Sequence, residues 1–282
     1  MITIDKTQNS PISIYLQTFI LNQFTFIMSK NLFFGFNWKA NPKTFTEAME
    51  LSDQYGDLYD KLLALPNTNL EKTLNYAVFP TDLAVPLLSP HQKTLIGIQD
   101  VSTNTNGAWT GQTTAVLAQT AGCHYAIIGH SETRLQYALT NSTLNQKIKA
   151  TLDAQLIPVI CTAFVNEESA NAELTSDLVA NLQDIDVESD FIVAFEPLAS
   201  IGGSAMKPDQ VNDYLAFIKS VLVNQGFNNF IVLYGGGVNP SNVLELSKCE
   251  NVDGFLVGGA SLKIDQVEAL LTIANDYLST VN

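Results

Sequence analysis

Short apolar runs alternate with longer segments of mixed polarity from about residue 32 to the end of the chain. The runs are rich in β-branched and aromatic residues, which suit buried strands. Eight such runs are predicted as strands, at residues 32–38, 74–79, 94–99, 123–129, 156–161, 191–196, 230–235 and 253–258. Because the runs are apolar almost without interruption, we expect both faces of each strand to be buried.

The segments between these runs carry apolar residues at i, i+3 and i+4, the spacing of an amphipathic helix. Examples are residues 45–65, 112–122, 144–155, 209–226 and 264–278. Strands that alternate with helices pair in parallel through right-handed crossovers, which defines the α/β class. Eight such units fill the roughly 250 residues of a closed (β/α)8 barrel. An open doubly wound sheet is the alternative, but it favours a G-x-G-x-x-G turn where this chain has NWKANP.

Residues 1–30 precede the first predicted strand, and we expect them to be a leader outside the fold. Residues 31–282 then form a single barrel domain. The stretch 11–28 resembles a signal sequence or a membrane span, but polar residues such as Gln17 interrupt it and no small-residue cleavage site follows. Met28 is therefore a candidate start of the protein.

The composition narrows the range of partners. The chain has 282 residues and a formal net charge of -14, which opposes binding to nucleic acid and to anionic membranes. Neither is expected as a partner, although a small anion can still be held locally. The three cysteines are Cys123, Cys161 and Cys249, and they form no C-x-x-C pair and no cluster with histidine at metal-ligand spacing. We therefore expect a cytoplasmic protein without a bound metal.

Polar residues stand at the ends of several predicted strands. Glu196 ends the sixth run, and a carboxylate there is costly unless water, a partner or a function meets it. Asn37 and Lys39 end the first run at i and i+2, so they project to the same side. His130 and Glu132 follow the fourth run, where Ser131 and Glu132 are placed to open a helix. The loops after the strands of such a barrel gather at one rim, so these side chains converge.

Each of these residues also has a structural interpretation, as a rim charge, a hydrogen-bonded histidine or half of a salt bridge. Taken together they indicate more, because glycine-rich backbone follows the seventh and eighth runs at 234–237 and 254–261. The loops after the last two strands often bind phosphate in this fold. The site would thus combine a base, a cation, an imidazole and a site for an anion. This combination predicts proton abstraction next to a carbonyl in a small phosphorylated substrate.

Seven motifs resemble those of the triosephosphate isomerase family, in its order and at similar spacing. They are FNWKANP (36–42), GIQDVS (97–102), GAWTGQT (107–113), AIIGHSETR (126–134), AFEPLASIG (194–202), LYGGGVNPSN (233–242) and GFLVGGASL (254–262). The resemblance covers nearly the whole chain after Asn31. It implies a TIM barrel and the interconversion of glyceraldehyde 3-phosphate and dihydroxyacetone phosphate in glycolysis and gluconeogenesis. It also implies a cytoplasmic homodimer that needs no cofactor.

The resemblance assigns a role to each of the polar residues at the strand ends. Glu196 matches the base that moves a proton between neighbouring carbons, and His130 matches the neutral imidazole that polarises the carbonyl. Lys39 matches the lysine that supplies positive potential, with Asn37 as the amide beside it. Glu132 matches the carboxylate that pairs with this lysine.

The resemblance also implies binding sites for the phosphate and for a second subunit. The backbone donors for phosphate are Gly202, Gly237, Gly258 and Gly259. Gly202 belongs to the segment 197–205, which matches a lid that closes over the phosphate. The loop 103–112 matches one that inserts into a neighbouring subunit, with Thr110 as the inserted threonine.

Several positions depart from the family's motifs. Ala199 replaces a tryptophan of the lid, Gly237 replaces a serine, Thr133 replaces an arginine and Gln112 replaces a glutamate. The motif CIGE becomes CTAF at 161–164. Because Asn37, Lys39, His130 and Glu196 are intact, we expect a working isomerase with altered lid dynamics, and therefore altered phosphate affinity and turnover.

Two other functions are compatible with a barrel of this kind. An isomerase of another pathway would lack the NWK and GHSE motifs, and both are present. A non-catalytic barrel paralogue that binds a phosphorylated ligand or a partner protein has the same fold, so the fold does not exclude it.

Overall fold

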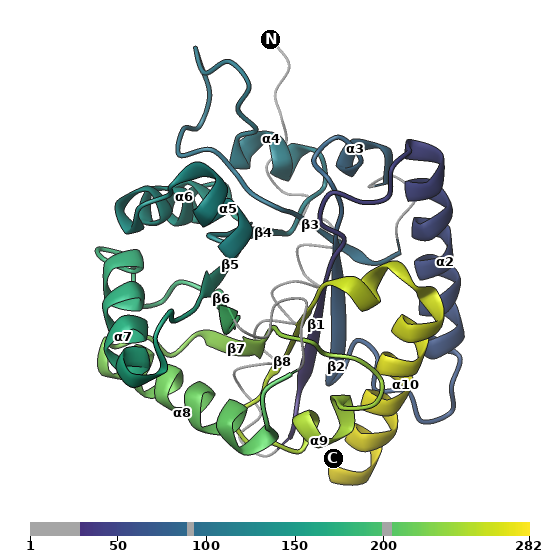
Figure 1. Cartoon of the computed structure of the whole chain (residues 1–282). Coiled ribbons are helices and arrows are strands. Elements are labelled where there is room, and N and C mark those ends of the chain that lie inside the picture. The colour runs from purple at the N-terminus through teal and green to yellow at the C-terminus, as the bar shows by residue number, and fades with distance from the viewer. Residues whose placement is uncertain (1–28, 89–92, 199–204) are drawn as a thin grey trace.

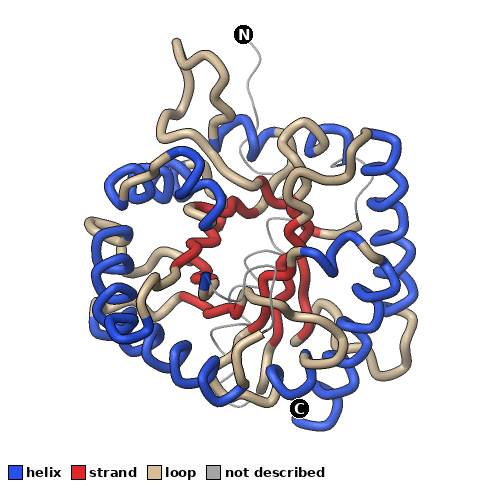
Figure 2. The backbone as a smooth tube through the Cα atoms, viewed as in Figure 1, coloured by secondary structure: helices blue, strands red, loops and turns tan. Residues whose placement is uncertain are grey.

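The computed structural model describes residues 29–88, 93–198 and 205–282. Within these residues, eight parallel strands close into a barrel in the order of the sequence, surrounded by helices (Figures 1 and 2). The strands are β1 (Leu32–Asn37), β2 (Leu74–Phe79), β3 (Leu95–Ile98), β4 (Tyr125–Ile128), β5 (Ile157–Thr162), β6 (Phe191–Phe195), β7 (Phe230–Tyr234) and β8 (Gly254–Val257). The predicted (β/α)8 barrel is confirmed.

The strand ends agree with the sequence pattern to within two residues. The helices are α2 (Phe45–Leu63), α3 (Val85–Leu88), α4 (Ala115–Thr120), α5 (Ser131–Tyr137), α6 (Asn141–Asp153), α7 (Ala170–Asn181), α8 (Pro208–Asn224), α9 (Val243–Ser247) and α10 (Ile264–Val281), with 3-10 turns η1 (Glu167–Ser169) and η3 (Gly259–Leu262). Helix α5 begins at Ser131 as expected. Helix α7 is absent from the five segments that the periodicity picks out, and only four of its residues are buried.

Alternation along the strands decides which side chains fill the barrel. In β1, Phe33 belongs to the cluster inside the barrel, whereas Phe34 and Phe36 pack in the layer between strands and helices. In β6, Ile192 and Ala194 lie inside. The same alternation makes Asn37, the last residue of β1, and Glu196, the first residue after β6, the next inward positions. Both therefore lie at the carboxyl-terminal mouth of the barrel.

Local signals explain where the long helices begin. Helix α2 starts at a capping box, in which the N–H of Glu47 donates to the Thr44 hydroxyl at 3.2 Å and the N–H of Thr44 donates to the Glu47 carboxylate at 3.2 Å. Helix α8 begins with Pro208, whose missing N–H costs nothing in the first turn. Each helix then presents its apolar face to the strands.

Lys30 joins the beginning and the end of the barrel. Its ammonium donates to the carbonyls of Cys249 and Val252 at 2.7 and 2.6 Å. Its N–H donates to Oδ1 of Asn282 at 2.8 Å, and the Asn282 amide donates to the Lys30 carbonyl at 2.9 Å. Burial lowers the pKa of Lys30 to about 8, although Asp253 opposes this. The boundary that we place after residue 30 stays a prediction, and the predictions for residues 1–28 lie outside the described residues.

Candidate active site

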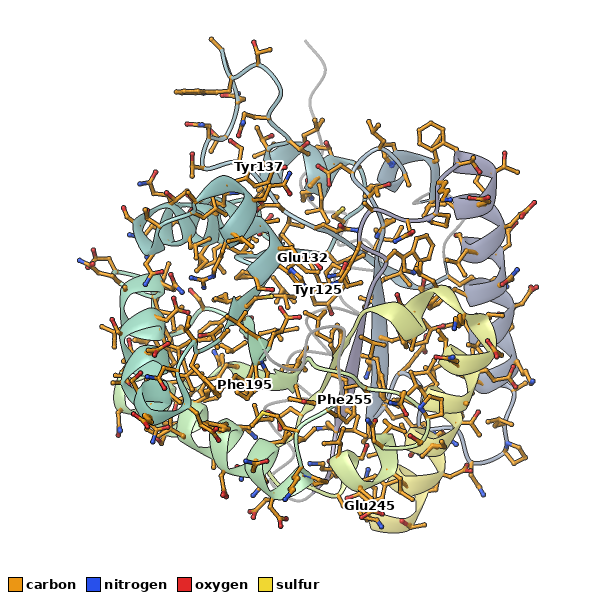
Figure 3. The ribbon with its side chains drawn as sticks, viewed as in Figure 1. Tyr125, Glu132, Tyr137, Phe195, Glu245 and Phe255 are labelled. Carbon is orange, nitrogen blue, oxygen red and sulfur yellow. The ribbon has the colours of Figure 1, made fainter. Side chains whose placement is uncertain are left out.

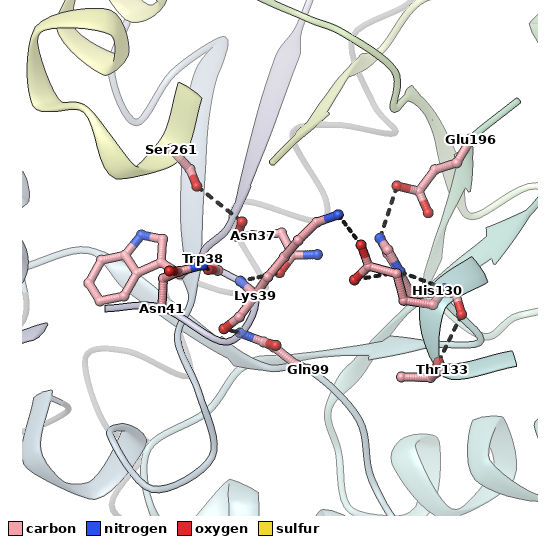
Figure 4. A network of polar contacts seen from close by, with 10 residues as sticks. Asn37, Trp38, Lys39, Asn41, Gln99, His130, Thr133, Glu196 and Ser261 are labelled. Atoms are coloured by element: carbon pink, nitrogen blue, oxygen red, sulfur yellow. Dashed lines mark hydrogen bonds and ion pairs between the residues drawn. The ribbon is translucent and has the colours of Figure 1, made fainter. Parts of the chain in front are cut away.

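The polar residues that follow β1, β4 and β6 meet at the carboxyl-terminal mouth of the barrel. Figure 3 shows Glu132 near the barrel axis, while Tyr137 of the same helix lies further out. Figure 4 shows Asn37, Lys39, His130 and Glu196 in one network of polar contacts. All five residues predicted for the chemistry are thus brought together.

The turn after β1 holds Lys39 in an unusual backbone conformation. Its φ is 54°, in the left-handed region that residues other than glycine rarely adopt. The Lys39 N–H donates to Oδ1 of Asn37 at 2.9 Å. The Gln99 amide donates to the Lys39 carbonyl at 2.8 Å (Figure 4). It also donates to the Phe79 carbonyl at 2.9 Å. Gln99 therefore braces the turn from the end of β3, and such braced strain is common at functional sites.

Asn37 is held from the other side by the last β-to-α connection. The Ser261 hydroxyl donates to the Asn37 carbonyl at 3.0 Å (Figure 4). Asn37 and Ser261 are both buried, so this bond is shielded from water. This bond fixes the backbone of Asn37 and so helps to position its side chain.

Lys39 and Glu132 form an ion pair across the mouth. The ammonium of Lys39 lies 2.5 Å from Oε1 of Glu132. Both side chains remain partly exposed, at 31% and 53% of their full surfaces. This pairing agrees with the role that the resemblance gives to Glu132, and it keeps the Lys39 ammonium facing the mouth.

His130 is buried and engages both of its ring nitrogens. The N–H of Glu132, in the first turn of α5, donates to Nδ1 at 3.2 Å. Nε2 lies 3.4 Å from Oε1 of Glu196. Because Nδ1 accepts a hydrogen bond, the proton of the neutral ring is on Nε2, which can donate to Glu196 or to a substrate oxygen.

Opposing effects act on the pKa of His130. Burial lowers this pKa, but the hydrogen bond to Glu196 and the charges of Glu196 and Glu132 outweigh burial, so the pKa lies above its ordinary value. The positive end of α5 opposes protonation of the ring, since the helix N–H already points at Nδ1. His130 is consequently neutral at alkaline pH and becomes an imidazolium on the acid side.

Glu196 is the buried carboxylate of the site. It is 6% exposed, its N–H donates to the Thr162 carbonyl at 2.9 Å, and its Oε2 has no hydrogen-bond partner among the described residues. Gly235 makes room for it, because a Cβ there would lie 2.8 Å from Cγ of Glu196. A buried carboxylate oxygen without a partner is costly, and it is free to accept a proton.

A cleft of about 900 Å³ opens beside Glu196, between α5 and the loop after β5. Pockets for small ligands commonly have volumes of about 300–1,000 Å³. The residues that border this cleft include Glu132, Arg134, Leu135, Cys161, Phe164, Asp177 and Leu198. This cleft reaches Glu132 and Glu196, whereas Asn37, Lys39 and His130 do not border it.

The predicted phosphate donors are only partly described. Gly258 lies against Lys39, since a Cβ there would be 3.4 Å from Cε of the lysine, and Gly259 opens η3. Gly237 has a φ of 59°, and its carbonyl accepts hydrogen bonds from Asn239 and Asn242 at 2.9 Å each. Gly202 and Ala199 lie outside the described residues, so the altered lid stays a prediction.

Thr110 lies far from these residues, in the loop between β3 and α4. This loop extends away from the barrel beyond the ring of helices (Figure 1). Thr110 and its neighbour Trp109 are exposed. Thr110 is therefore no part of this chain's own site.

Three positions that contribute to the site were not singled out from the sequence. They are Gln99, Gly235 and Arg134, which sits behind His130. All three fall within the matched motifs, but their roles depend on partners from other strands. Thr133 is one of the positions that depart from the family's motifs. Its hydroxyl donates to the His130 carbonyl at 2.8 Å.

Within the described residues, no group of three or more histidine, cysteine or acidic side chains is arranged to hold a metal ion. No helix in the same residues is both long and apolar enough to cross a bilayer.

Comparison with known proteins matches the chain and its fold to one family. The family model for triosephosphate isomerase matches residues 32–274. The triosephosphate isomerase of Mycoplasmopsis pulmonis is 34% identical over 254 residues, which cover 87% of this chain and 98% of that protein. That of Alkaliphilus metalliredigens is 33% identical over 251 residues, covering 85% and 96%.

A solved structure supports the same assignment. The crystal structure of triosephosphate isomerase from Bartonella henselae superposes with a TM-score of 0.72 at 25% identity, covering 86% of this chain and 99% of that one. The matched region includes every strand of the barrel, and the identities extend over nearly the full length of the relatives. The chain belongs to the triosephosphate isomerase family and is an isomerase.

Proposed function

We propose that this chain interconverts glyceraldehyde 3-phosphate and dihydroxyacetone phosphate with Glu196 as the base and His130 as the electrophile. The observation that carries the proposal is the 3.4 Å approach of Nε2 of His130 to Oε1 of Glu196, both nearly buried. This geometry supports a substrate whose carbonyl oxygen accepts from Nε2–H while Glu196 faces the neighbouring carbon.

The reaction needs only proton shifts, one between the two carbons and one between their oxygens. Glu196 takes a proton from the carbon next to the carbonyl, and the electron pair moves to the carbonyl oxygen to give an enediolate. Glu196 then returns the proton to the former carbonyl carbon. Nε2 of His130 gives its proton to the enediolate oxygen and takes the proton of the other hydroxyl, so one carbon is oxidised as the other is reduced. The balance involves no external oxidant or reductant, which fits a site built from these residues alone.

The surroundings favour the charge that develops on the enediolate. The Nε2–H of His130 and the ammonium of Lys39 point into the mouth. His130 is buried, which strengthens its interaction with the developing charge, whereas Lys39 is partly exposed and contributes a full positive charge. Asn37 fixes the Lys39 backbone, and Glu132 keeps its ammonium in place. We therefore assign Asn37, Lys39, His130, Glu132 and Glu196 to the chemistry.

We further assign the substrate phosphate to the backbone of Gly202, Gly237, Gly258 and Gly259. The support is the family resemblance together with the closeness of Gly258 to the Lys39 side chain. An ammonium beside glycine-rich backbone provides charge and N–H donors for one anion.

A homodimer in the cytoplasm completes the proposal. Large apolar side chains are exposed on the side of the barrel that carries the β3–α4 loop, where Trp109 is 53% exposed and Leu135 is 87% exposed. Large aromatic residues such as tryptophan are enriched at protein interfaces, which supports a partner at this loop. A second subunit that receives the loop at Thr110 would cover these side chains. The free thiols of Cys123, Cys161 and Cys249 suit a reducing compartment.

Turnover of glyceraldehyde 3-phosphate by the purified protein tests the function, with Glu196→Gln as the decisive variant. Since general-base catalysis contributes about 10²–10⁴-fold, kcat should fall by at least about 10²-fold in Glu196→Gln. Glu268→Gln on the outer helix α10 is the matched control and should retain full kcat. Absence of turnover in a folded wild-type protein would instead favour the non-catalytic barrel that binds a phosphorylated ligand.

A further inference from the structure

Arg134 of helix α5 uses every N–H of its guanidinium. Nε donates to the Gly129 carbonyl at 2.8 Å, and Nη2 donates to the Cys161 carbonyl at 2.8 Å. Nη1 and Nη2 pair with the two carboxylate oxygens of Asp177 at 2.9 and 3.1 Å. Nη1 also donates to Oδ1 of Asn141 at 3.2 Å. A guanidinium has five donors, so this fork is saturated.

The contacts of Arg134 connect the ends of two neighbouring strands. Gly129 directly follows β4 and has a φ of 72°, and a Cβ there would lie 3.2 Å from Nε of Arg134. Cys161 belongs to β5, which pairs with β4. The guanidinium therefore fixes the backbone at the point where the chain leaves β4, one residue before His130.

The carboxylate of Asp177 completes this arrangement from helix α7. Besides Arg134, it accepts a hydrogen bond from the Thr162 hydroxyl at 2.7 Å. Bidentate pairs of this geometry are the strong and directional ones. The Arg134 and Asp177 side chains are 23% and 14% exposed, so water screens them little.

The loop after β5 lacks the carboxylate that the family's motif has there. The family's motif after the fifth strand ends in glutamate, but Phe164 stands there instead. Its ring packs against Phe195 and Tyr214, with centroids 5.9 and 5.1 Å apart. The loop after β5 thus contributes an aromatic contact, and Asp177 supplies the negative charge from the next helix.

We propose that Arg134, held by Asp177, is a positioning residue for His130. It fixes the turn between β4 and α5 so that the Glu132 N–H reaches Nδ1 and Nε2 faces Glu196. Neither Arg134 nor Asp177 touches the reacting atoms in this role. The inference deepens the proposed function and rests on it for its kinetic test.

The variants Arg134→Ala and Asp177→Asn test the role by kinetics. Because small misplacements of catalytic groups cost up to about 10²-fold, kcat should fall by about 10²-fold in Arg134→Ala, with KM nearly unchanged. Low millimolar guanidinium should restore part of the lost kcat, since it can occupy the vacated fork. Asp177→Asn keeps the shape of the side chain and should lower kcat by a smaller factor.

Lys219→Met provides the matched control. Lys219 and Asp253 form an ion pair of 2.9 Å with similar exposure, 26% and 24%, at the opposite end of the barrel. This variant should lose similar stability and retain kcat, with no response to guanidinium. An equal loss of kcat in Lys219→Met, or full kcat in folded Arg134→Ala, would overturn the proposal. If Arg134→Ala does not fold, full kcat in Asp177→Asn would overturn it.

Nuclear magnetic resonance of the His130 ring gives a readout that does not require turnover. In Arg134→Ala, or in Asp177→Asn if the former does not fold, the Nδ1 resonance should lose the shift caused by the Glu132 N–H, and the pKa of His130 should change. Lys219→Met should leave both as in the wild type. An unchanged ring in the Arg134 or Asp177 variant contradicts the positioning role even if the wild type has no isomerase activity. Absent turnover with a perturbed ring would contradict the proposed function alone.

Discussion

Each ring nitrogen of His130 has its own partner, and this makes the residue a direct test of the electrostatics of the site. We expect His130→Gln to lower kcat/KM by about 10²–10³-fold, the usual effect of removing a donor to a developing oxyanion. The pKa of His130 is raised by Glu196 and Glu132 against the effect of burial. In the wild type, kcat/KM should therefore begin to fall at a pH above about 6.5, the ordinary histidine value.

The pH profile of kcat/KM checks this assignment. As pH falls, an imidazolium forms, breaks the bond from the Glu132 N–H to Nδ1 and neutralises the charge of Glu196. In His130→Gln the acid limb should move to lower pH, because only carboxylates then titrate. An acid limb at the same pH in both proteins would show that His130 does not take part in it. Because His130 and Glu196 interact closely, the acid limb of the wild type reports the titration of the two residues as a pair.

Gly235 provides a second test, which asks whether Glu196 needs the space that the missing Cβ of this glycine leaves. In Gly235→Ala the new Cβ would lie 2.8 Å from Cγ and 3.2 Å from Oε1 of Glu196, so the carboxylate must move. We expect kcat to fall by about 10²-fold, with an overpacking cost of about 1–3 kcal/mol in the free energy of unfolding. Steady-state kinetics and denaturant unfolding measure the two effects.

Gly56→Ala is the matched control for this variant. Gly56 lies in α2, where a Cβ would meet no atom within 4 Å. Because alanine favours a helix over glycine, we expect a gain of about 0.5–1 kcal/mol and unchanged kcat. Equal kinetics in the two alanine variants would refute the steric role of Gly235.

At the scale of single residues, the sequence singled out the groups that we propose for the chemistry and missed those that hold them. Glu196 and His130 are conspicuous because a charge or an imidazole at the end of an apolar run demands an explanation. Arg134 gave no such signal, because its partners Asp177 and Cys161 come from other elements. Supporting contacts of this kind exist only once the strands are side by side.

At the scale of elements, the end of β3 supports the turn after β1. Gln99→Met keeps the length of the side chain and removes both donors to the carbonyls of Lys39 and Phe79. Two hydrogen bonds of about 1 kcal/mol each hold the strained turn, and about 1.4 kcal/mol corresponds to tenfold. We therefore expect kcat/KM to fall by up to about 30-fold. Steady-state kinetics measure this loss, and circular dichroism checks that the variant is folded.

Gln225→Met is the control for this substitution. Gln225 follows α8, and its side-chain amide donates to the Val221 carbonyl at 3.3 Å, far from Lys39 in the sequence. Its replacement should leave kcat/KM unchanged. A comparable loss in both variants would mean that Gln99 has no special link to Lys39.

The sequence predicted elements well where the hydrophobic period was clean. The strands 74–79 and 230–234 were found almost to the residue, because both are unbroken apolar or β-favouring runs; the first is buried throughout and the second over its last three residues. Helix α7 was harder to recognise, since its apolar face is narrow and rests on Leu174 and Leu178. Its importance became visible only through Asp177, which no periodicity distinguishes from a surface residue.

At the scale of the whole molecule, the exposed β3–α4 loop is the feature that the isolated barrel does not explain. We expect the wild type to sediment as a dimer and Trp109→Ser to dissociate at concentrations where the wild type does not, because large aromatic residues dominate interfaces. Val281→Ser removes an exposed apolar side chain from the end of α10 and should leave the dimer intact. A monomeric wild type would contradict the proposed homodimer.

The closed barrel was predictable as a whole because parallel strands that are apolar on both faces need helices around them and neighbours on both edges. The same pattern could not show which side of the barrel receives a partner. That depends on exposed side chains such as Leu135 and Tyr137, whose apolar character alone suggests a core. The predictions for residues 199–204 remain untested, since these lie outside the described residues.

Finally, the mutual hydrogen bonds of Lys30 and Asn282 have a consequence for how this chain can be rewired. Two points so close can be joined by a short linker, and new ends can be opened elsewhere. A circular permutant that begins at the exposed Glu188, before β6 and away from the mouth, should fold into the same barrel and keep its turnover. Such a molecule would show that the order in which the eight units leave the ribosome is incidental to the site that they build.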